Sequence, residues 1–595
     1  MNNHRKTGPS RSRLPWVAVM AAATLAISAC GGGDSGSPAA PNPAPPSNPT
    51  PPPTTTPPPT TAPPPTTAPP PAVAPTASEA GRFLTQSTFG PTDASIERIR
   101  SVGYSAWIDE QFAVPASPHL AYVRANYDPA ISGANFNWLQ DSFWQQALAA
   151  PDQLRQRVKF ALSQILVVSA ENGTIASLAD SHASYVDLLG EHAFGNYRQL
   201  LEAVATHPAM GLYLSHLRNR KGDPVTGRVP DENFAREVMQ LFSIGLLELN
   251  QDGTPRLVNG APVETYTNAD TSGIARVFTG WSWAAPTTTD QAFNGTTTAT
   301  YPDRNVRPMQ AYPQFHETGA KAFLGVTIPP NTSAQASMKI AMDTLFNHPN
   351  LCPFIGRQLV QRLVTSNPGP AYVGRVAAAC ANNGSGVRGD MKAIIRAILL
   401  DAEARDAGKL ADPQWGKVRE PVLRLSNWAR CFNATSASGN WTIRGLDSPS
   451  TSLGQQPLRP PSVFNFYRPG YTPPNTAIAT AGLVAPEFQI VGETSVVGYV
   501  NFMQGVISAG TGVAVNGVRD VRANYAAEQA IADDVDALLG RIDRCLTNGA
   551  MPTAMRQEIR NAVNAISLTT TNGRANRVHT AILLTMASPE YLVQK

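Results

Sequence analysis

The chain has 595 residues, of which 15% are charged, and a formal net charge of +4. Its arginines are interspersed with acidic residues and form no basic stripe, so the composition excludes nucleic acid as an implied partner. The length suffices for one large domain or for two to three closely packed subdomains.

Residues 1–29 have the layout of a secretory signal peptide. A basic head precedes an apolar run of about a dozen residues, fewer than the roughly 20 that a membrane-spanning helix needs. The run ends in small residues directly before Cys30, which resembles the lipobox of bacterial lipoproteins. There a signal peptidase cuts before the cysteine, and the thiol carries diacylglycerol. We therefore expect lipidation of Cys30; the alternative is an ordinary cleaved signal peptide with an incidental cysteine. Gly31 stands where Asp often signals inner-membrane retention, which favours the outer membrane.

Residues 30–77 consist mostly of Gly, Ser, Pro and Thr, with hardly a charge or a large apolar side chain. Such a segment cannot build a hydrophobic core. Its proline density favours polyproline II, in which residues 38–75 would reach roughly 100 Å at about 3.1 Å per residue. We expect a disordered tether between the lipid and a folded domain, residues 78–595.

Helical periodicity dominates this folded part. Apolar residues between 154 and 166 recur at steps of three and four, a pattern typical of one buried helix face. Strand signals are few, and the clearest is residues 247–250, followed by an Asp-Gly turn and a return strand around 263–266. We predict a mainly α fold, one large multi-helical domain with a small β-hairpin. The further predicted helices lie near residues 184–192, 196–206, 231–246, 270–280, 335–347, 353–365, 371–381, 390–404, 416–432, 523–545, 553–566 and 574–587.

Four cysteines lie in the folded part: Cys352, Cys380, Cys431 and Cys545. An even number in an oxidising compartment allows disulfides, with three connectivities. Pairing of Cys352 with Cys380 is favoured because they lie on consecutive predicted helices. No spacing suggests zinc.

Ten segments spread over the folded part carry a resemblance that composition does not supply. They are RFLTQSTFGPT (82–92), HPAMGLYLS (207–215), DENFAREVMQLFSIGL (231–246), ARVFTGWS (275–282), HETGAKAFLG (316–325), FIGRQLVQRLVTSNP (354–368), RGDMKAIIRAILLD (388–401), REPVLRL (419–425), RPPSVFNFYRP (459–469) and SPEYLVQ (588–594). As a set they resemble the bacterial family catalogued as domain of unknown function 1800. The resemblance implies an exported, largely helical protein with no established reaction, and it transfers no catalytic residue. Genes of this family often neighbour those of a second exported family, domain of unknown function 1501, which implies a partner or a shared pathway.

Glu237 is the first candidate for acid–base chemistry. It follows Arg236 around a predicted helix towards its apolar edge, where a carboxylate needs a partner to stay charged. A buried structural ion pair is the favoured interpretation, and a catalytic acid or base is the alternative. Arg236 can itself pair with Glu232, four residues earlier.

His316 and Glu317 are the second candidate, in a predicted loop that also leads to Lys321. A His beside a Glu supplies a proton carrier near neutral pH and an acceptor that fixes its tautomer. Hydrogen bonding that holds the loop is the favoured interpretation. A shared site with Glu237 requires these residues to converge with Arg236 and Arg357 on one open cleft.

A third pattern, Glu248, Asn250 and Asp252, matches part of an EF-hand calcium loop. Asn259 stands where the bidentate carboxylate belongs, and an Asp-Gly hairpin turn explains the pattern without a metal. We assign no metal site, and no motif indicates a cofactor.

The carboxyl half is rich in arginine. Arginine forks bind carboxylates and phosphates, so an anionic envelope ligand is one interpretation. Internal ion pairs are the favoured one. The arginines are Arg357, Arg362, Arg375, Arg388, Arg396, Arg405, Arg419, Arg424, Arg459 and Arg468.

Two functions from different classes remain open. The first is a noncatalytic binding or assembly protein of the cell envelope, anchored by its lipid and working with another exported protein. The second is an envelope hydrolase that uses an acid and a histidine, with or without a metal. The first is favoured because the folded part contains none of the GxSxG, Walker, GxGxxG or HExxH motifs.

Overall fold

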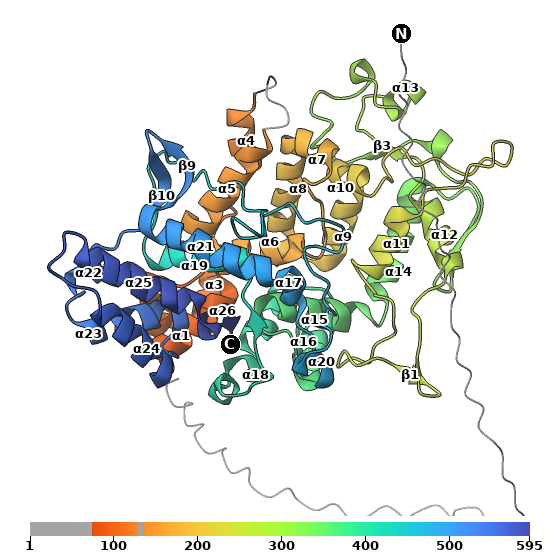
Figure 1. Cartoon of the computed structure of the whole chain (residues 1–595). Coiled ribbons are helices and arrows are strands. Elements are labelled where there is room, and N and C mark those ends of the chain that lie inside the picture. The colour runs from red at the N-terminus through yellow and green to blue at the C-terminus, as the bar shows by residue number, and fades with distance from the viewer. Residues whose placement is uncertain (1–73, 129, 131–134) are drawn as a thin grey trace, which may run out of the picture. The chain divides into compact units, whose positions relative to one another are not determined.

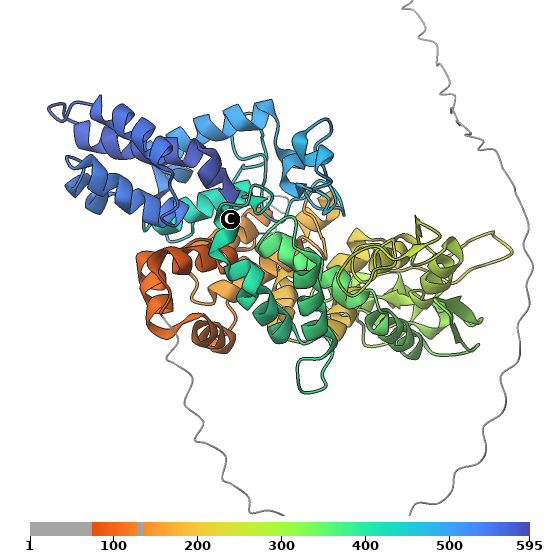
Figure 2. The same cartoon turned by 90° about the horizontal axis from the view of Figure 1, so that it is seen from below.

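The computed structural model describes residues 74–128, 130 and 135–595. Cys30, the predicted signal peptide and most of the predicted tether lie outside these residues. The described chain forms 26 α-helices and only short antiparallel strands, which confirms the predicted mainly α fold. Figures 1 and 2 show α22–α25 at one end of the helical array and α11, α12 and α14 at the other.

The first helix begins where the predicted tether ends. α1 (Ala77–Ser87) starts with a capping box, in which the Thr76 hydroxyl accepts from the backbone N–H of Glu79. The Glu79 carboxylate in turn accepts from the backbone N–H of Thr76 at 2.8 Å. This reciprocal capping satisfies two backbone donors and explains why the chain becomes helical at this point.

One large apolar cluster is built mainly by helices from the amino-terminal two thirds of the described chain. They are α1, α2 (Asp93–Val102), α3 (Tyr104–Ala113), α6 (Gln153–Ser163), α7 (Gly173–Ser177), α8 (Ala179–Glu191), α9 (Tyr197–Thr206), α10 (Pro208–Tyr213), α11 (Asn233–Gln240), α12 (Asn268–Val277), α14 (Ala334–Asn347), α15 (Leu351–Leu363), α16 (Pro370–Ala381), α17 (Met391–Leu400) and α18 (Ala402–Arg405).

A second apolar cluster gathers the carboxyl-terminal helices around α5 and α19. Its helices are α4 (Leu120–Asn126), α5 (Phe136–Ala149), α19 (Pro421–Cys431), α21 (Glu493–Ala509), α23 (Val535–Ile542), α24 (Thr553–Asn564), α25 (Gly573–Ala587) and α26 (Pro589–Leu592). The short helices α13 (Asp290–Phe293), α20 (Ala477–Thr480) and α22 (Ala526–Ala530) complete the set.

Helix α6 contributes to both clusters. Leu154 and Val158 pack in the first cluster, and Phe160 packs in the second. Most of its polar side chains are buried as well, including Arg157 and Lys159. α6 is therefore enclosed by the two halves of the fold.

The strands are short. The pairs are β1 (Leu257–Val258) with β2 (Ala261–Pro262), β3 (Trp281–Ser282) with β4 (Gln310–Ala311), β5 (Lys321–Phe323) with β6 (Val326–Ile328), and β7 (Lys417–Val418) with β11 (Val593–Gln594). β10 (Val518–Arg522) lies between β8 (Thr435–Ser436) and β9 (Thr511–Val515). Three of these pairings join segments far apart in the chain: β3 with β4, β7 with β11, and β8 with β10. The predicted pairing of residues 247–250 with 263–266 is present as one isolated bridge, Leu247 with Glu264, and Leu249 forms a second bridge with Pro255.

Several predicted helices are shorter or divided in the structure. The predicted helix 390–404 divides at Asp401, whose carboxylate caps α18 through the backbone N–H of Glu403. The predicted helix 523–545 divides in the same way at Asp534, which caps α23. The predicted helix 416–432 begins only at Pro421, a residue suited to the first helical position.

Both pairs of cysteines in the folded part form disulfides. Cys352 on α15 is bonded to Cys380 on α16, the pairing that the sequence favours. Cys431 at the end of α19 is bonded to Cys545 across 114 positions of the chain. The second bond ties α19 to the carboxyl-terminal helices.

Buried neutral histidines make the fold sensitive to acid. Burial lowers the pKa of His182 and His207 to about 3 and that of His216 to about 4, from 6.5. As the pH falls below 6.5, the unfolded chain binds protons that the folded chain does not, so stability falls with pH through this window. At about pH 4.5 we expect each such histidine to cost up to about 3 kcal/mol. Urea unfolding at neutral pH and at pH 4.5 measures the loss of unfolding free energy. The variant His182→Leu should lose less unfolding free energy between these two pH values than the wild type. Equal unfolding free energies at both pH values would contradict this assignment.

Candidate functional site

Glu237 lies on α11 with its side chain largely buried. Burial raises its pKa, an effect that the neighbouring Arg236 partly offsets. Arg236 pairs instead with Glu232 at 3.4 Å, the i,i+4 pair that the sequence predicts. One carboxylate oxygen of Glu237 has no hydrogen-bond partner among the described residues.

His316 is enclosed by α12, α14 and their loops. Its Nδ1 lies 2.9 Å from the carbonyl oxygen of Thr279, and its Nε2 lies 3.4 Å from the hydroxyl of Ser337. Burial is the main cause of its lowered pKa, so the ring is neutral near pH 7. The Glu317 carboxylate accepts from the backbone N–H of Gly319 at 2.8 Å. These contacts hold the loop in place.

Of the remaining candidates, Lys321 lies beside His316 and Glu317: its Nζ lies 3.5 Å from the carbonyl oxygen of Gly319, and its charge contributes to the lowered pKa of His316. Arg357 has separate surroundings. Lys321 is buried at the start of β5, and burial lowers its pKa. Arg357 on α15 donates to the carbonyl of Gly253 at 3.4 Å, at the turn of the predicted hairpin. In the part of the chain that the structure describes, no hydrogen bond or ion pair joins Glu237 to His316, Glu317, Lys321 or Arg357.

The hairpin turn that resembles a calcium loop is closed by its own contacts. Asp252 accepts from both the backbone N–H and the hydroxyl of Thr254, and Glu248 pairs with Arg256. Within residues 74–128, 130 and 135–595, no three His, Cys, Asp or Glu side chains gather in a way that would hold a metal ion.

A cluster of charged side chains lies where the two apolar clusters meet. Its members are fully or almost fully buried, and we call it the buried charge cluster: Arg157, Arg362, Lys417, Glu420 and Glu487. Lys417 of β7 and Glu487 form an ion pair at 2.9 Å. Glu420 accepts from the side-chain amides of Gln164 and Gln455. Burial raises the pKa of Glu487, and Lys417 opposes that rise.

Helix carbonyls balance the excess of cations in this cluster. Arg157 and Lys417 both donate to the carbonyl of Arg362, at 2.6 and 2.9 Å, in the last turn of α15. Arg362 donates to the carbonyl of Gln164, at the end of α6. Helix carboxyl ends carry partial negative charge and unpaired carbonyls, so buried cations are stabilised there. The cluster is therefore structural and closed to ligands.

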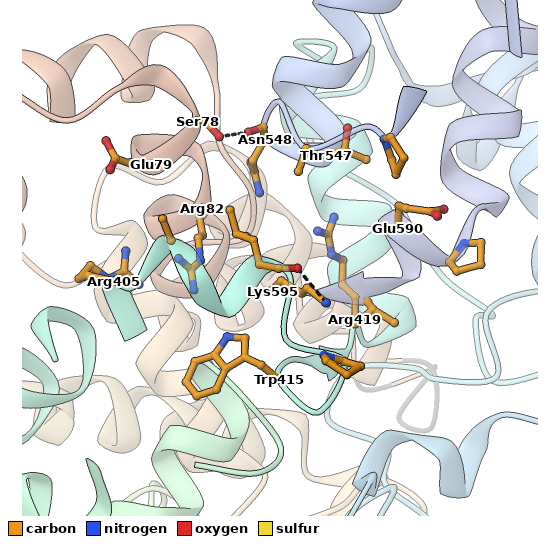
Figure 3. Close-up of a pocket in the computed structure, with 17 residues that line it drawn as sticks. Ser78, Glu79, Arg82, Arg405, Trp415, Arg419, Thr547, Asn548, Glu590 and Lys595 are labelled. Atoms are coloured by element: carbon orange, nitrogen blue, oxygen red, sulfur yellow. Dashed lines mark hydrogen bonds between the residues drawn. The ribbon is translucent and has the colours of Figure 1, made fainter. Parts of the chain in front are cut away.

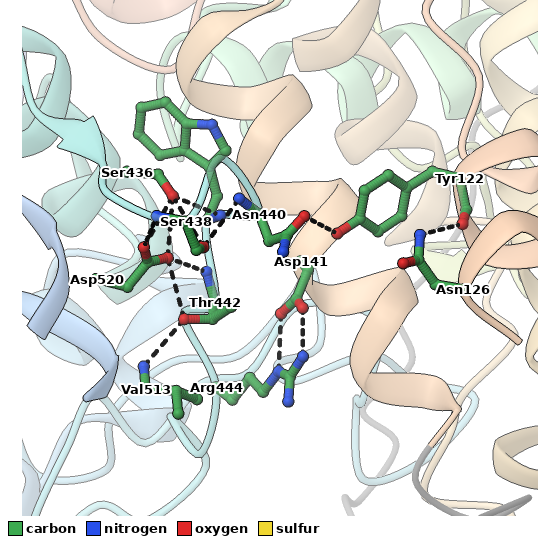
Figure 4. A network of polar contacts seen from close by, with 11 residues as sticks. Tyr122, Asn126, Asp141, Ser436, Ser438, Asn440, Thr442, Arg444, Val513 and Asp520 are labelled. Carbon is green, nitrogen blue, oxygen red and sulfur yellow. Dashed lines mark hydrogen bonds and ion pairs between the residues drawn. The ribbon is translucent and has the colours of Figure 1, made fainter. Parts of the chain in front are cut away.

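A second polar network fixes the loop that follows β8. Asp520 accepts from the backbone N–H groups of Ser438 and Thr442, at 2.7 and 2.9 Å, and from nearby hydroxyls (Figure 4). Arg444 forms a bidentate pair with the buried Asp141 of α5. Both carboxylates are occupied by internal contacts, so this network also supports the fold.

An open pocket of about 440 Å³ lies between α1, the chain after α18, the loop before α24 and the last residues of the chain (Figure 3). We call it the basic pocket, since four cationic side chains line it: Arg82, Arg405, Arg419 and Lys595. Its lining also includes Trp415, prolines and two carboxylates, Glu79 and Glu590. A volume of this order suits a small ligand.

Aromatic rings and carbonyls position the cations of the basic pocket. The Arg405 guanidinium lies over the rings of Phe83 and Tyr104, at 5.2 and 5.6 Å. Arg419 lies 4.4 Å over the ring of Tyr591. Lys595 donates to the carbonyls of Leu410 and Asp412.

The sequence indicates this pocket only in part. Arg405 and Arg419 belong to the arginine-rich series, and several other members of that series form internal ion pairs, such as Arg375 with Asp401. Arg82 begins the first of the ten family-like segments. Nothing local relates these residues to Lys595, because the pairing of β7 with β11 brings them together.

The fold and the pocket define a large helical protein whose open cavity is suited to binding. The family model described as "Protein of unknown function (DUF1800)" matches residues 82–593, so the chain belongs to this family. No curated protein and no solved structure matches the chain. Every helix among the described residues is too short or too polar to span a bilayer.

The buried ion pair provides a test of the charge cluster. Lys417→Met leaves the Glu487 carboxylate buried and unpaired, which should cost about 3–5 kcal/mol of unfolding free energy. The double variant Lys417→Met/Glu487→Leu should lose less, because no charge is then left alone. Denaturant unfolding measures both, with Lys339→Met as the control, because its exposed pair with Asp343 contributes at most about 1 kcal/mol. A Lys417→Met variant as stable as this control would contradict the assignment.

Proposed function

We propose that this protein is exported, is anchored to the cell envelope by lipid on Cys30, and binds a ligand without transforming it. The sequence pattern before Cys30 supports the anchor, and Gly31 favours the outer membrane. The observation that carries the binding function is the basic pocket, which is open and of ligand size.

The lining of the basic pocket supports binding over catalysis. It contains no histidine or cysteine among the described residues. Of its two hydroxyl side chains, Ser78 donates to the carbonyl of Asn548, and Thr547 donates to that of Asp543. The Glu79 carboxylate is occupied in the cap of α1. No nucleophile with an adjacent base is therefore present there. The hydrolase alternative needs Glu237 and His316 in one site, and no contact favours that arrangement.

A second exported protein completes the proposal. Family resemblance suggests a partner of the domain of unknown function 1501 type. The tether would allow the folded part to meet such a partner at a distance of roughly 100 Å from the lipid.

The anchor is tested by metabolic labelling with a radioactive fatty acid. The wild-type chain should incorporate the label, and its mature amino terminus should be a modified Cys30. Cys30→Ser should abolish the label, while the disulfide variant Cys352→Ser/Cys380→Ser should retain it. An unmodified amino terminus beyond residue 30 would refute the anchor.

The partnership is tested by co-purification from solubilised envelopes of a bacterium that encodes both families. We expect the tagged chain to recover the domain of unknown function 1501 protein, and an unrelated tagged lipoprotein to leave it behind. Repeated recovery of the chain alone, with and without chemical cross-linking, would count against an assembly role.

A further inference from the structure

The four cations of the basic pocket lack acidic partners. Among the described residues, none of the ion pairs includes Arg82, Arg405, Arg419 or Lys595. Figure 3 shows these side chains across the pocket, with Glu79 and Glu590 at its margins. The lining therefore carries four cationic side chains against two acidic ones, an excess of positive charge.

Buried nitrogen donors at the wall of the pocket also lack acceptors. Arg82 is 6% exposed and Arg419 is 3% exposed. Nε and Nη2 of Arg82, Nε of Arg405 and Nε of Arg419 have no hydrogen-bond partner in the described part of the chain. Each of these arginines also has a partner: Arg82 donates to the carbonyl of Asp406, Arg405 to the side-chain oxygen of Gln86, and Arg419 to that of Asn427. Arg157 and Arg362 of the buried charge cluster have unpaired nitrogens of the same kind, so what distinguishes the pocket arginines is their position at an open cavity.

The guanidinium groups are held in place before any ligand arrives. Arg405 lies over the rings of Phe83 and Tyr104, and Arg419 lies over the ring of Tyr591. Arg82 donates to the carbonyl of Asp406 at 2.8 Å. Such preorganisation reduces the entropy that binding costs. Burial, and then the charge of Arg82, lower the pKa of Arg405 to about 10, so the Arg405 guanidinium remains charged near neutral pH.

We infer that the basic pocket binds the oxyanion group, a phosphate or a carboxylate, of a small envelope ligand. Arginine forks match the paired oxygens of both groups, and Lys595 adds a point charge. The apolar part of the wall, including Trp415, Pro413 and Pro552, suits the body of the ligand, such as a sugar ring. This inference rests on the proposed binding function and specifies its ligand chemistry.

Calorimetric titration of the full chain with matched probes tests the inference. Glucuronate and glucose differ in one carboxylate, and inorganic phosphate supplies the anion alone. We expect glucuronate to bind at least tenfold more tightly than glucose, and phosphate to compete with glucuronate. Added salt should weaken the binding of both anions. A further experiment compares vesicles of phosphatidylglycerol, which are anionic, with vesicles of phosphatidylcholine. If only the anionic vesicles displace bound phosphate, the pocket binds the oxyanion group of a lipid headgroup.

Variants connect the binding to the pocket. Arg405→Gln and Lys595→Gln should each weaken glucuronate and phosphate binding at least tenfold. Arg256→Gln, which removes an exposed arginine of the hairpin, should leave binding unchanged. If Arg405→Gln fails to fold, the anion affinity of Lys595→Gln provides the test, because Lys595 is partly exposed.

Two outcomes overturn the inference. Equal affinities for glucose and glucuronate would show that the pocket does not recognise an oxyanion, while the proposed binding function would still hold. Wild-type anion affinity in Lys595→Gln and Arg405→Gln, or no binding of any anion probe, would remove the oxyanion site. The anchor and the partner are judged separately, by the labelling of Cys30 and by co-purification.

Discussion

The fold depends on burying charge where α6 and α15 end. The carboxyl ends of the two helices present carbonyls to the interior, and Arg157, Arg362 and Lys417 donate to them. Because helix ends carry partial negative charge, cations are stabilised there without an equal number of carboxylates. Glu420 and Glu487 complete the balance, through the amides of Gln164 and Gln455 and through Lys417. The two apolar clusters are thus joined by buried polar contacts between α6, α15, β7 and the residues that follow them.

The basic pocket is a consequence of the same arrangement. Arg419 directly follows β7 and precedes Glu420 of the buried charge cluster, so its position is fixed by the interior. The pairing of β7 with β11 carries the end of the chain to this place, beside α1 and Arg82. The pocket therefore collects side chains from both ends of the folded part. Its cations differ from those of the cluster in one respect: they line an open pocket, whereas those of the cluster are enclosed by the fold.

Many charged and polar side chains outside the pocket support the fold. Asp520, Asp141 and His316 are held by internal contacts that fix loops. Arg375 and Arg396 of the arginine-rich half form ion pairs, as sequence reasoning favours for the series. An arginine becomes a candidate for ligand binding only when it lies beside an open cavity and belongs to no ion pair.

The sequence by itself determined the helical class, the buried face of α6 and the family, because periodicity and local motifs are properties of neighbouring residues. It also favoured the Cys352–Cys380 pairing, which lies between consecutive helices. Helix ends were harder to predict from the sequence, because capping residues such as Asp401 and Asp534 interrupt hydrophobic patterns that look continuous. Only the tertiary structure decided which charges meet. Arg82, Arg405, Arg419 and Lys595 are far apart in the chain, and their convergence follows from helix packing and from the β7–β11 pairing, which leave no signal in any local stretch of sequence.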